Sequence, residues 1–290
     1  MAGNGIDLVL IFGATGQSGK ECFTACRAHG FKTLAFVRSR DKATRVLGAE
    51  APVVVGDVAN PESIEAALKG VSHIIIALGA SSKEVGSCAE VVEYGGMKSI
   101  LTAAKNVGSI KRIVYETSHG VEDPFWFFAG FLNYMAKDTL AWKLRSELLL
   151  RESGIPYVVV RPTGLKNNDG NIPPVLQQPS AGEWGMSMIS REVVGEICAR
   201  ALFQAAECTS FSCREDKKAG KIGLSEYDWV GTFGRLQRDG PMRATFEDHI
   251  AGKMSFQNKW RVIKYAFRAG FVLSLALLAS KLLQRRNALK

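Results

Sequence analysis

An apolar run that stops at a glycine-containing loop constrains the fold of this chain more than any other feature. Residues 8–12, LVLIF, are followed by GATGQSG (13–19) and then by a helix-like segment at 17–29. In strand–loop–helix units that bind dinucleotides, such glycines allow a sharp turn, close approach of the backbone to a pyrophosphate, and tight helix packing. The N-terminus of the helix adds unpaired N–H groups that attract an anion. The loop therefore predicts a pyrophosphate site, with three chance turn glycines as the alternative.

The rest of residues 1–216 repeats the alternation of strand and helix. Apolar runs rich in Val and Ile predict strands, and amphipathic stretches between them predict helices. This rhythm indicates an α/β domain with a doubly wound parallel sheet, covered by helices on both faces (a Rossmann domain). The expected strands are 7–13, 32–37, 51–56, 72–78, 111–117, 156–162 and 209–213, and the expected helices are 17–29, 61–69, 88–107, 137–153 and 190–205.

The end of the second expected strand indicates which dinucleotide binds. A carboxylate at this place recognises the ribose 2′-hydroxyl of NAD, whereas arginine recognises the 2′-phosphate of NADP. Here the strand ends in Val37-Arg38-Ser39-Arg40, with Lys42 just beyond, and Asp41 comes only after both arginines. Guanidinium groups pair with phosphate bidentately, so NADPH is predicted over NADH. A merely solvated basic strand end is the alternative.

Further cofactor contacts are expected after the third and fourth strands. Asp57 either caps the next turn or contacts the adenine, and Ala77-Leu78-Gly79 supplies small residues where a strand end passes beneath the cofactor. The predicted cofactor-binding residues are Gly13, Thr15, Gly16, Gln17, Ser18, Gly19, Arg38, Ser39, Asp57, Val58, Ala77, Leu78, Gly79 and Lys143.

Over residues 6–213 the chain resembles the atypical short-chain dehydrogenase/reductases, particularly the NmrA-like, NAD(P)H-binding group. Besides the glycine loop, the resemblance depends on GDVANPESIEAALKGVSHIIIALGA (56–80), VVEYGGMKSILTAAKNVGSIKRIVY (91–115), LRSELLLRESGIPYVVVRPTGL (144–165) and SMISREVVGEICARAL (187–202). Their order and spacing identify the family more specifically than any one of them does. The resemblance implies the same fold and a bound dinucleotide.

The resemblance also implies catalytic residues, with one departure. The superfamily uses a serine after the fifth strand and a Tyr-x-x-x-Lys pair, in which lysine holds the ribose and lowers the tyrosine pKa. Ser118 and Lys143 fall on the serine and lysine positions, but the tyrosine position is Thr139. Tyr134, three residues before Lys137, is a substitute if both share one helix face. Relatives similar to isoflavone and phenylcoumaran reductases use the lysine alone. A surface role for Lys143 is the alternative.

Two other features leave alternatives open. His119 is a possible proton donor beside Ser118, although a lone loop histidine is more often incidental. The aromatic segment 121–135, VEDPFWFFAGFLNYM, is consistent with an apolar substrate pocket, a docking patch or core packing.

The C-terminal region differs in composition from the rest. The formal net charge is +9, and from His249 to Lys290 there are nine Lys or Arg and no acidic residue. We predict an irregular linker at 217–258 and a basic, partly apolar helix at 259–290. The uncharged part of this helix, 269–280, is shorter than the ~20 residues of a bilayer span. Three roles of the tail therefore stay open. It associates with a membrane, in the interface or as a weak anchor, it docks on a partner protein, or it packs on its own chain. Nucleic acid binding is not expected.

The six scattered cysteines contain no CxxC pair, which predicts a reducing compartment and no metal site. No N-terminal address is visible, so the cytoplasm or the cytoplasmic face of a membrane is expected. Two functions fit these features. The first is an NADPH-dependent oxidoreductase acting on a small or lipophilic carbonyl or enone. The second is a non-catalytic NADPH-binding structural, assembly or redox-sensing subunit, held at a membrane or in a complex by its tail.

Overall fold

The computed structural model describes residues 8–80, 87–168, 170–178, 187–216 and 218–263. Its centre is an eight-stranded sheet with the order β3-β2-β1-β4-β5-β6-β10-β8, in which only β8 is antiparallel to its neighbour. All seven strands expected from the sequence are present, and the predicted doubly wound α/β fold is confirmed. The strands are β1 (Leu8–Phe12), β2 (Lys32–Val37), β3 (Val53–Val55), β4 (His73–Ile76), β5 (Arg112–Glu116), β6 (Tyr157–Pro162), β8 (Pro174–Gln177) and β10 (Thr209–Glu215), with a separate pair of β7 (Gly164–Lys166) and β9 (Met188–Ser190).

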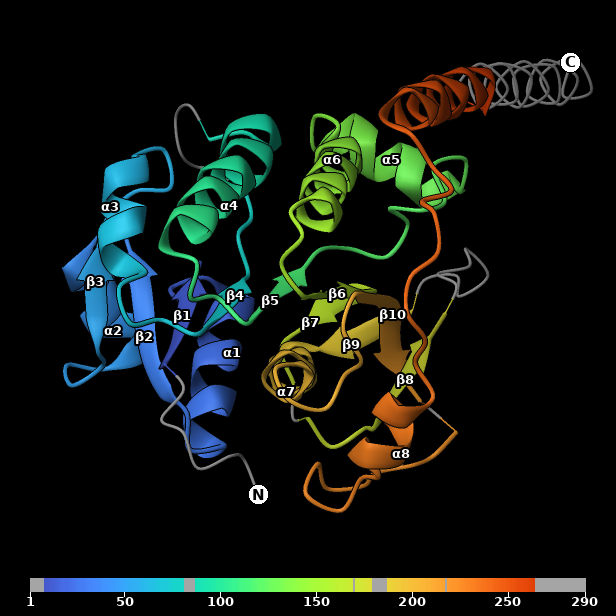
Figure 1. The fold of residues 1–290 in the computed structure, drawn as a ribbon. Helices are drawn as coiled ribbons and strands as arrows, with labels where there is room; N and C mark the ends of the chain where they lie inside the picture. The colour runs from blue at the N-terminus through green and yellow to red at the C-terminus, as the bar shows by residue number, and fades with distance from the viewer. Residues whose placement is uncertain (1–7, 81–86, 169, 179–186, 217, 264–290) are drawn as a thin grey trace, which may run out of the picture.

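Helices cover both faces of the sheet (Figure 1). The five expected helices are present, and the structure adds α2, α5 and α8. A π-helical turn, η1, leads directly into α4. The helices are α1 (Gln17–Ala28), α2 (Arg40–Leu47), α3 (Pro61–Ala67), η1 (Glu90–Gly95), α4 (Gly96–Val107), α5 (Phe127–Met135), α6 (Thr139–Glu152), α7 (Arg191–Ala201), α8 (Trp229–Gly234) and a helix over residues 246–263.

Alternating residues of β1 divide the core into two layers. Val9 and Ile11 pack with α1 and α7 on one face, whereas Leu10 and Phe12 pack with α3 and α4 on the other. Since successive side chains of a strand point to opposite faces, a strand buried on both sides must be apolar throughout. This is why the run LVLIF shows no polar alternation.

The region after residue 217 differs from the expected linker. Trp229 and Phe233 of α8 are buried in the core layer formed by α1 and α7. The hydroxyl of Tyr227 donates a hydrogen bond to the carbonyl of Pro174 at 2.6 Å. Apolar side chains thus hold this segment against the sheet, and it belongs to the domain.

The last described helix begins at residue 246 rather than near 259. Thr245 and Asp248 form reciprocal side-chain-to-backbone bonds at its start, with distances of 2.8 and 3.1 Å, an arrangement that stabilises a helix N-terminus. Gly252 lies so close to the loop before α5 that a Cβ at this position would be 2.0 Å from the carbonyl oxygen of Pro124. The part of this helix up to Phe256 therefore packs on its own chain, whereas residues 258–263 are exposed. The rest of the predicted tail helix, 264–290, lies outside the described residues.

Helix α5 ends at Met135, before the lysine that was expected to share a face with Tyr134. Lys137 and Asp138 adopt positive φ angles of 49° and 64°, and α6 starts only at Thr139. The proposed pairing of Tyr134 and Lys137 on one helix face is therefore wrong, because a left-handed turn separates them. Within the described residues, no helix has the length and apolar character that crossing a bilayer requires.

A buried ion network joins α6 to β6. The guanidinium of Arg161 pairs with Glu147, and it also pairs with Glu122 at 2.8 Å. Thr117 donates a further hydrogen bond to Glu147 at 2.8 Å. Arg161 and Glu147 are completely or almost completely buried. Their charges are stabilised by each other, since an isolated charge at this depth would be costly.

Candidate functional site: a dinucleotide cavity

The glycine loop lies tightly between β1, β4 and α1. Gly13 adopts φ +80°, and a Cβ there would be 2.3 Å from the carbonyl oxygen of Ala77. A Cβ at Gly19 would be 2.1 Å from the carbonyl oxygen of Gly13. Because both neighbours are backbone atoms, neither can move aside as a side chain would. These positions require glycine, as the loop motif predicts.

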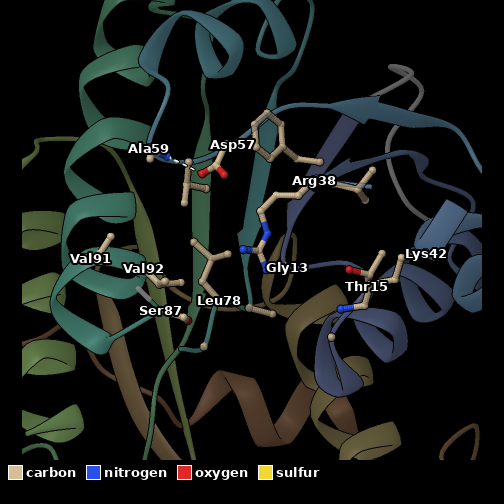
Figure 2. A pocket seen from close by; sticks show the side chains of 16 residues that line it. Gly13, Thr15, Arg38, Lys42, Asp57, Ala59, Leu78, Ser87, Val91 and Val92 are labelled. Carbon is tan, nitrogen blue, oxygen red and sulfur yellow. Dashed lines mark hydrogen bonds between the residues drawn. The ribbon is translucent and has the colours of Figure 1, made fainter. Parts of the chain in front are cut away.

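The loop borders a cavity of about 400 Å³ at the carboxyl ends of the strands. β1 pairs with β2 on one side and with β4 on the other, so the chain reverses its direction of winding here. Ligands of open α/β sheets bind at such a point. The cavity (Figure 2) is lined by Gly13, Thr15, Gly16, Phe36, Val37, Arg38, Lys42, Asp57, Val58, Ala59, Ala77, Leu78, Gly79, Ser87, Val91 and Val92.

Nine of the predicted cofactor residues are therefore brought together at the cavity wall. Figure 2 shows the side chain of Arg38 directed into the cavity, with Asp57 on the far side from Thr15. Asp57 accepts a hydrogen bond from the amide of Ala59 at 2.9 Å, so it caps the turn. Arg38 and Lys42 supply the positive charge that a phosphate needs, and these residues fit a phosphorylated dinucleotide.

The other predicted contacts do not line this cavity. The hydroxyl of Ser39 caps α2 by accepting a hydrogen bond from the amide of Lys42 at 3.2 Å. Ser18 hydrogen-bonds with its side chain to Glu116. Gln17 and Gly19 lie in the first turn of α1 behind the loop. Their contribution is to position the loop and the helix N-terminus.

Three lining residues come from a segment that showed no functional signal in the sequence. Ser87, Val91 and Val92 lie in and just before η1. In the sequence, Val91 and Val92 are part of an ordinary helix-like stretch. Only the tertiary fold shows that this turn forms a wall of the cavity.

Lys143, the remaining predicted cofactor contact, lies on α6 outside the cavity lining and pairs with Glu93, a residue of η1 next to that lining. Its Nζ is 3.2 Å from Oε2 of Glu93, and the two side chains are 12% and 3% exposed. The other oxygen of Glu93 accepts a hydrogen bond from the amide of Ala80 at 3.3 Å, directly after Gly79 of the lining. Lys143 is thus largely buried and connected to the cavity wall through one residue, unlike a lysine on a solvated helix face.

Ser118 and His119 follow β5. The hydroxyl of Ser118 donates to the carbonyl of His119 at 3.1 Å. His119 is buried, and its Nδ1 lies 2.9 Å from the hydroxyl of Ser212. Burial, together with the positive charge of Arg161, lowers the pKa of His119 to about 4. The imidazole is therefore neutral at neutral pH, and its contacts are those of a core residue.

Glu116, the last residue of β5, is a buried carboxyl that sequence reasoning missed. Burial raises its pKa, whereas the hydrogen bond from Ser18 and the charges of Lys143 and Arg191 act in the opposite direction. Glu116 thus forms a hydrogen bond with Ser18 at the start of α1 and interacts electrostatically with Lys143 of α6. Its only sequence signal is a carboxylate ending an otherwise apolar strand.

Tyr134 lies away from these groups, on α5. It is 46% exposed, and its ring centroid is 5.9 Å from that of Phe256 on the last helix. Phe127 and Phe131 of the same aromatic segment also contact Phe256. Part of this segment is core, since Val121 and Ala129 are fully buried. The exposed aromatic side chains form a surface that α5 shares with the C-terminal helix.

Comparison with known proteins agrees with this geometry. The profile of the NAD(P)H-binding family matches residues 13–205. The chain belongs to this family. Sanguinarine reductase of Eschscholzia californica is 28% identical over 267 residues, which cover 79% of this chain and 95% of that protein. The family membership confirms the expected resemblance to atypical short-chain dehydrogenase/reductases and identifies NAD(P)H as the cofactor.

Two further comparisons cover the nucleotide-binding domain. Protein TIC 62, chloroplastic, of Pisum sativum is 33% identical over 181 residues, but the match covers 55% of this chain and only 33% of that protein. A short-chain dehydrogenase/reductase from Veillonella parvula, solved in complex with NADP, has a TM-score of 0.60 at 18% identity, with 75% of this chain and 99% of that chain covered. The latter likeness concerns the fold.

Proposed function

We propose that this protein is an NADPH-dependent oxidoreductase that reduces a small or lipophilic carbonyl or enone-like acceptor. The observation that carries the proposal is the largely buried Lys143, whose ammonium is paired with Glu93 of η1, next to the cavity-lining residues Val91 and Val92. The ion pair fixes the position of the ammonium, which a catalytic or ribose-holding lysine requires. Similarity to sanguinarine reductase over nearly the whole length of that enzyme supports a reductase.

In this mechanism the bound cofactor supplies a hydride, and the residues of the chain bind and orient the reactants. The amides of the glycine loop and of the start of α1 would hold the pyrophosphate. Arg38 would hold the 2′-phosphate. Lys143 provides a positive charge near the acceptor oxygen and a route for its proton. Ser118 donates a hydrogen bond to that oxygen when its hydroxyl turns away from the carbonyl of His119. Thr139, at the usual tyrosine position, has no acidic proton to give.

The test is oxidation of NADPH by the purified full chain with a panel of quinones, enones, aldehydes and iminium compounds. Turnover that depends on one acceptor class supports the oxidoreductase. Tight NADPH binding without turnover by any acceptor would favour the non-catalytic subunit instead.

Arg38→Ala is expected to weaken NADPH binding about tenfold to a hundredfold while leaving NADH binding nearly unchanged. The reason is that, in the proposed binding mode, the guanidinium pairs with the 2′-phosphate, which NADH lacks. Calorimetry with both nucleotides measures the effect. Arg45→Ala is the matched control, because Arg45 is an exposed arginine of α2 and does not line the cavity. Equal losses for NADPH and NADH would contradict the assigned preference.

A second candidate function is a non-catalytic NADPH-binding subunit held at a membrane or in a complex. Thr139 in place of tyrosine and the basic tail favour it. The pea relative is a chloroplastic protein; for this chain, the cytoplasm or the cytoplasmic face of a membrane stays a prediction.

The role of the tail is tested with a chain that ends at Ile263, which retains the packed part of the last helix. We expect the full chain to sediment with vesicles containing anionic lipid, and the shortened chain to bind them at least about tenfold more weakly, since each basic residue near such a surface contributes about 1 kcal/mol. Vesicles of neutral lipid are the control. Identical distributions of the two chains would remove the membrane proposal.

A further inference from the structure

A second cavity, of about 570 Å³, lies toward the edge of the sheet that β8 forms. It is formed by α6, β6, β8, β10 and the segment 235–243. This segment runs beside β8 and β10, between α8 and the last helix (Figure 1). None of the described residues lines both this cavity and the dinucleotide cavity. A ligand of this second cavity can therefore be inferred from its own lining residues, independently of the proposed oxidoreductase function.

The inner wall of the cavity contains two arginines that are already neutralised. Arg161 pairs with Glu122 and Glu147, as described above. Arg151 pairs with Asp239 at 2.9 Å and donates a hydrogen bond to Ser210 at 3.0 Å. Its Nε–H is buried and has no acceptor among the described residues. The wall is thus fixed in position and retains one unused donor.

The outer wall carries three more arginines that have no such partners. Arg235, Arg238 and Arg243 are exposed, and no described carboxylate lies within ion-pair distance of any of them. The contacts that they make are weak, since Arg235 lies 3.3 Å from the hydroxyl of Thr232 and Arg238 lies 3.8 Å from the sulfur of Cys208. Among the described residues, and with Glu147 included, five arginines face three carboxylates, which leaves a surplus of two positive charges.

The backbone holds these arginines on one side of the cavity. The amide of Gln237 donates to the side chain of Gln178 at 2.8 Å, and the amide of Asp239 donates to the carbonyl of Cys208 at 2.8 Å. The segment is therefore anchored at two places between Arg235 and Arg243. Like charges gathered on an anchored segment repel one another unless an anion lies between them.

We propose that this cavity binds a small multivalent anion, a molecule with two or more phosphate or carboxylate groups. Guanidinium groups present paired N–H donors that match the oxygens of either group. A cavity of this volume lies in the range of small-molecule sites. The surplus of two charges indicates a ligand with at least two negative charges.

The test is calorimetric titration of the full chain with inorganic pyrophosphate and, separately, with citrate. Saturating NADP⁺ is present so that the dinucleotide cavity is filled. We expect saturable binding of at least one anion, and the one that binds more tightly distinguishes phosphate from carboxylate. In Arg238→Ala/Arg243→Ala the affinity should fall about tenfold or more. Raising the salt concentration should also weaken binding, since both side chains are exposed.

The matched control is Arg27→Ala/Arg45→Ala, which removes the same charge from two exposed arginines that line neither cavity. Its anion affinity should equal that of the unchanged chain. Thermal unfolding checks that both double variants are folded. Absence of saturable binding with either anion, or equal affinities in the two double variants, would overturn the proposal.

Discussion

Lys143→Met is expected to lower kcat by about a hundredfold or more, because general acid–base groups contribute ~10²–10⁴ to catalysis. Methionine keeps most of the volume of the buried side chain but carries neither the charge nor the proton. It leaves Glu93 without its partner at 3.2 Å. NADPH oxidation with the best acceptor of the panel measures kcat and KM, and the dissociation constant of NADPH is measured alongside.

Lys98→Met is the matched control, because Lys98 is an exposed lysine of the neighbouring helix α4. It should leave kcat unchanged. Glu93→Gln tests the pairing itself, since it keeps the shape and removes the charge that holds the ammonium. We expect it to shift the pH profile of kcat more than it changes NADPH affinity. An unchanged kcat in Lys143→Met would exclude the lysine from catalysis.

Glu147→Ala is expected to reduce the free energy of unfolding by about 3–5 kcal/mol, the range found when one partner of a buried ion pair is removed. The carboxylate is fully buried, and it accepts hydrogen bonds from both Arg161 and Thr117. Its loss leaves part of the positive charge of Arg161 uncompensated and opens a small cavity in the protein. Urea unfolding followed by circular dichroism measures the change.

Two comparisons separate charge from volume. Glu147→Gln keeps the size of the side chain and one acceptor, so it should cost less than alanine. Glu152→Ala removes an exposed glutamate from the end of the same helix and should change stability by no more than about 0.5 kcal/mol. A loss below about 1 kcal/mol in Glu147→Ala would show that Glu122 alone neutralises Arg161.

The parts of the fold that were predicted well depend on local chemistry. Asn60 illustrates this: it accepts hydrogen bonds from the amides of Glu62 and Ser63 at the start of α3, with Pro61 in the first turn, as the Asn-Pro-Glu pattern predicts. Helix α5 was missed because its residues are aromatic and its start lacks a side-chain cap. The short strand β8 was missed because pairing with β10 defines it.

In the candidate site, too, the residues with a local signal were predicted and those defined by long-range contacts were not. The glycines of the loop and Arg38 were found because their functions follow from backbone conformation and from position at a strand end. Glu93 was not found, since its pairing with Lys143 joins residues fifty positions apart. The same is true of the arginine cavity, whose walls come from helix α6, three strands and the segment 235–243.

The sequence by itself determined the succession of the seven parallel strands and of five helices, the dinucleotide loop and the charge at the second strand end. These features depend on side-chain periodicity and backbone stereochemistry, which act over a few residues. Only the tertiary structure decided that Lys143 is paired with Glu93 near the dinucleotide cavity, that Tyr134 faces the last described helix and that five arginines meet around the second cavity. Such arrangements depend on contacts between distant segments, where packing and charge compensation outweigh local preference.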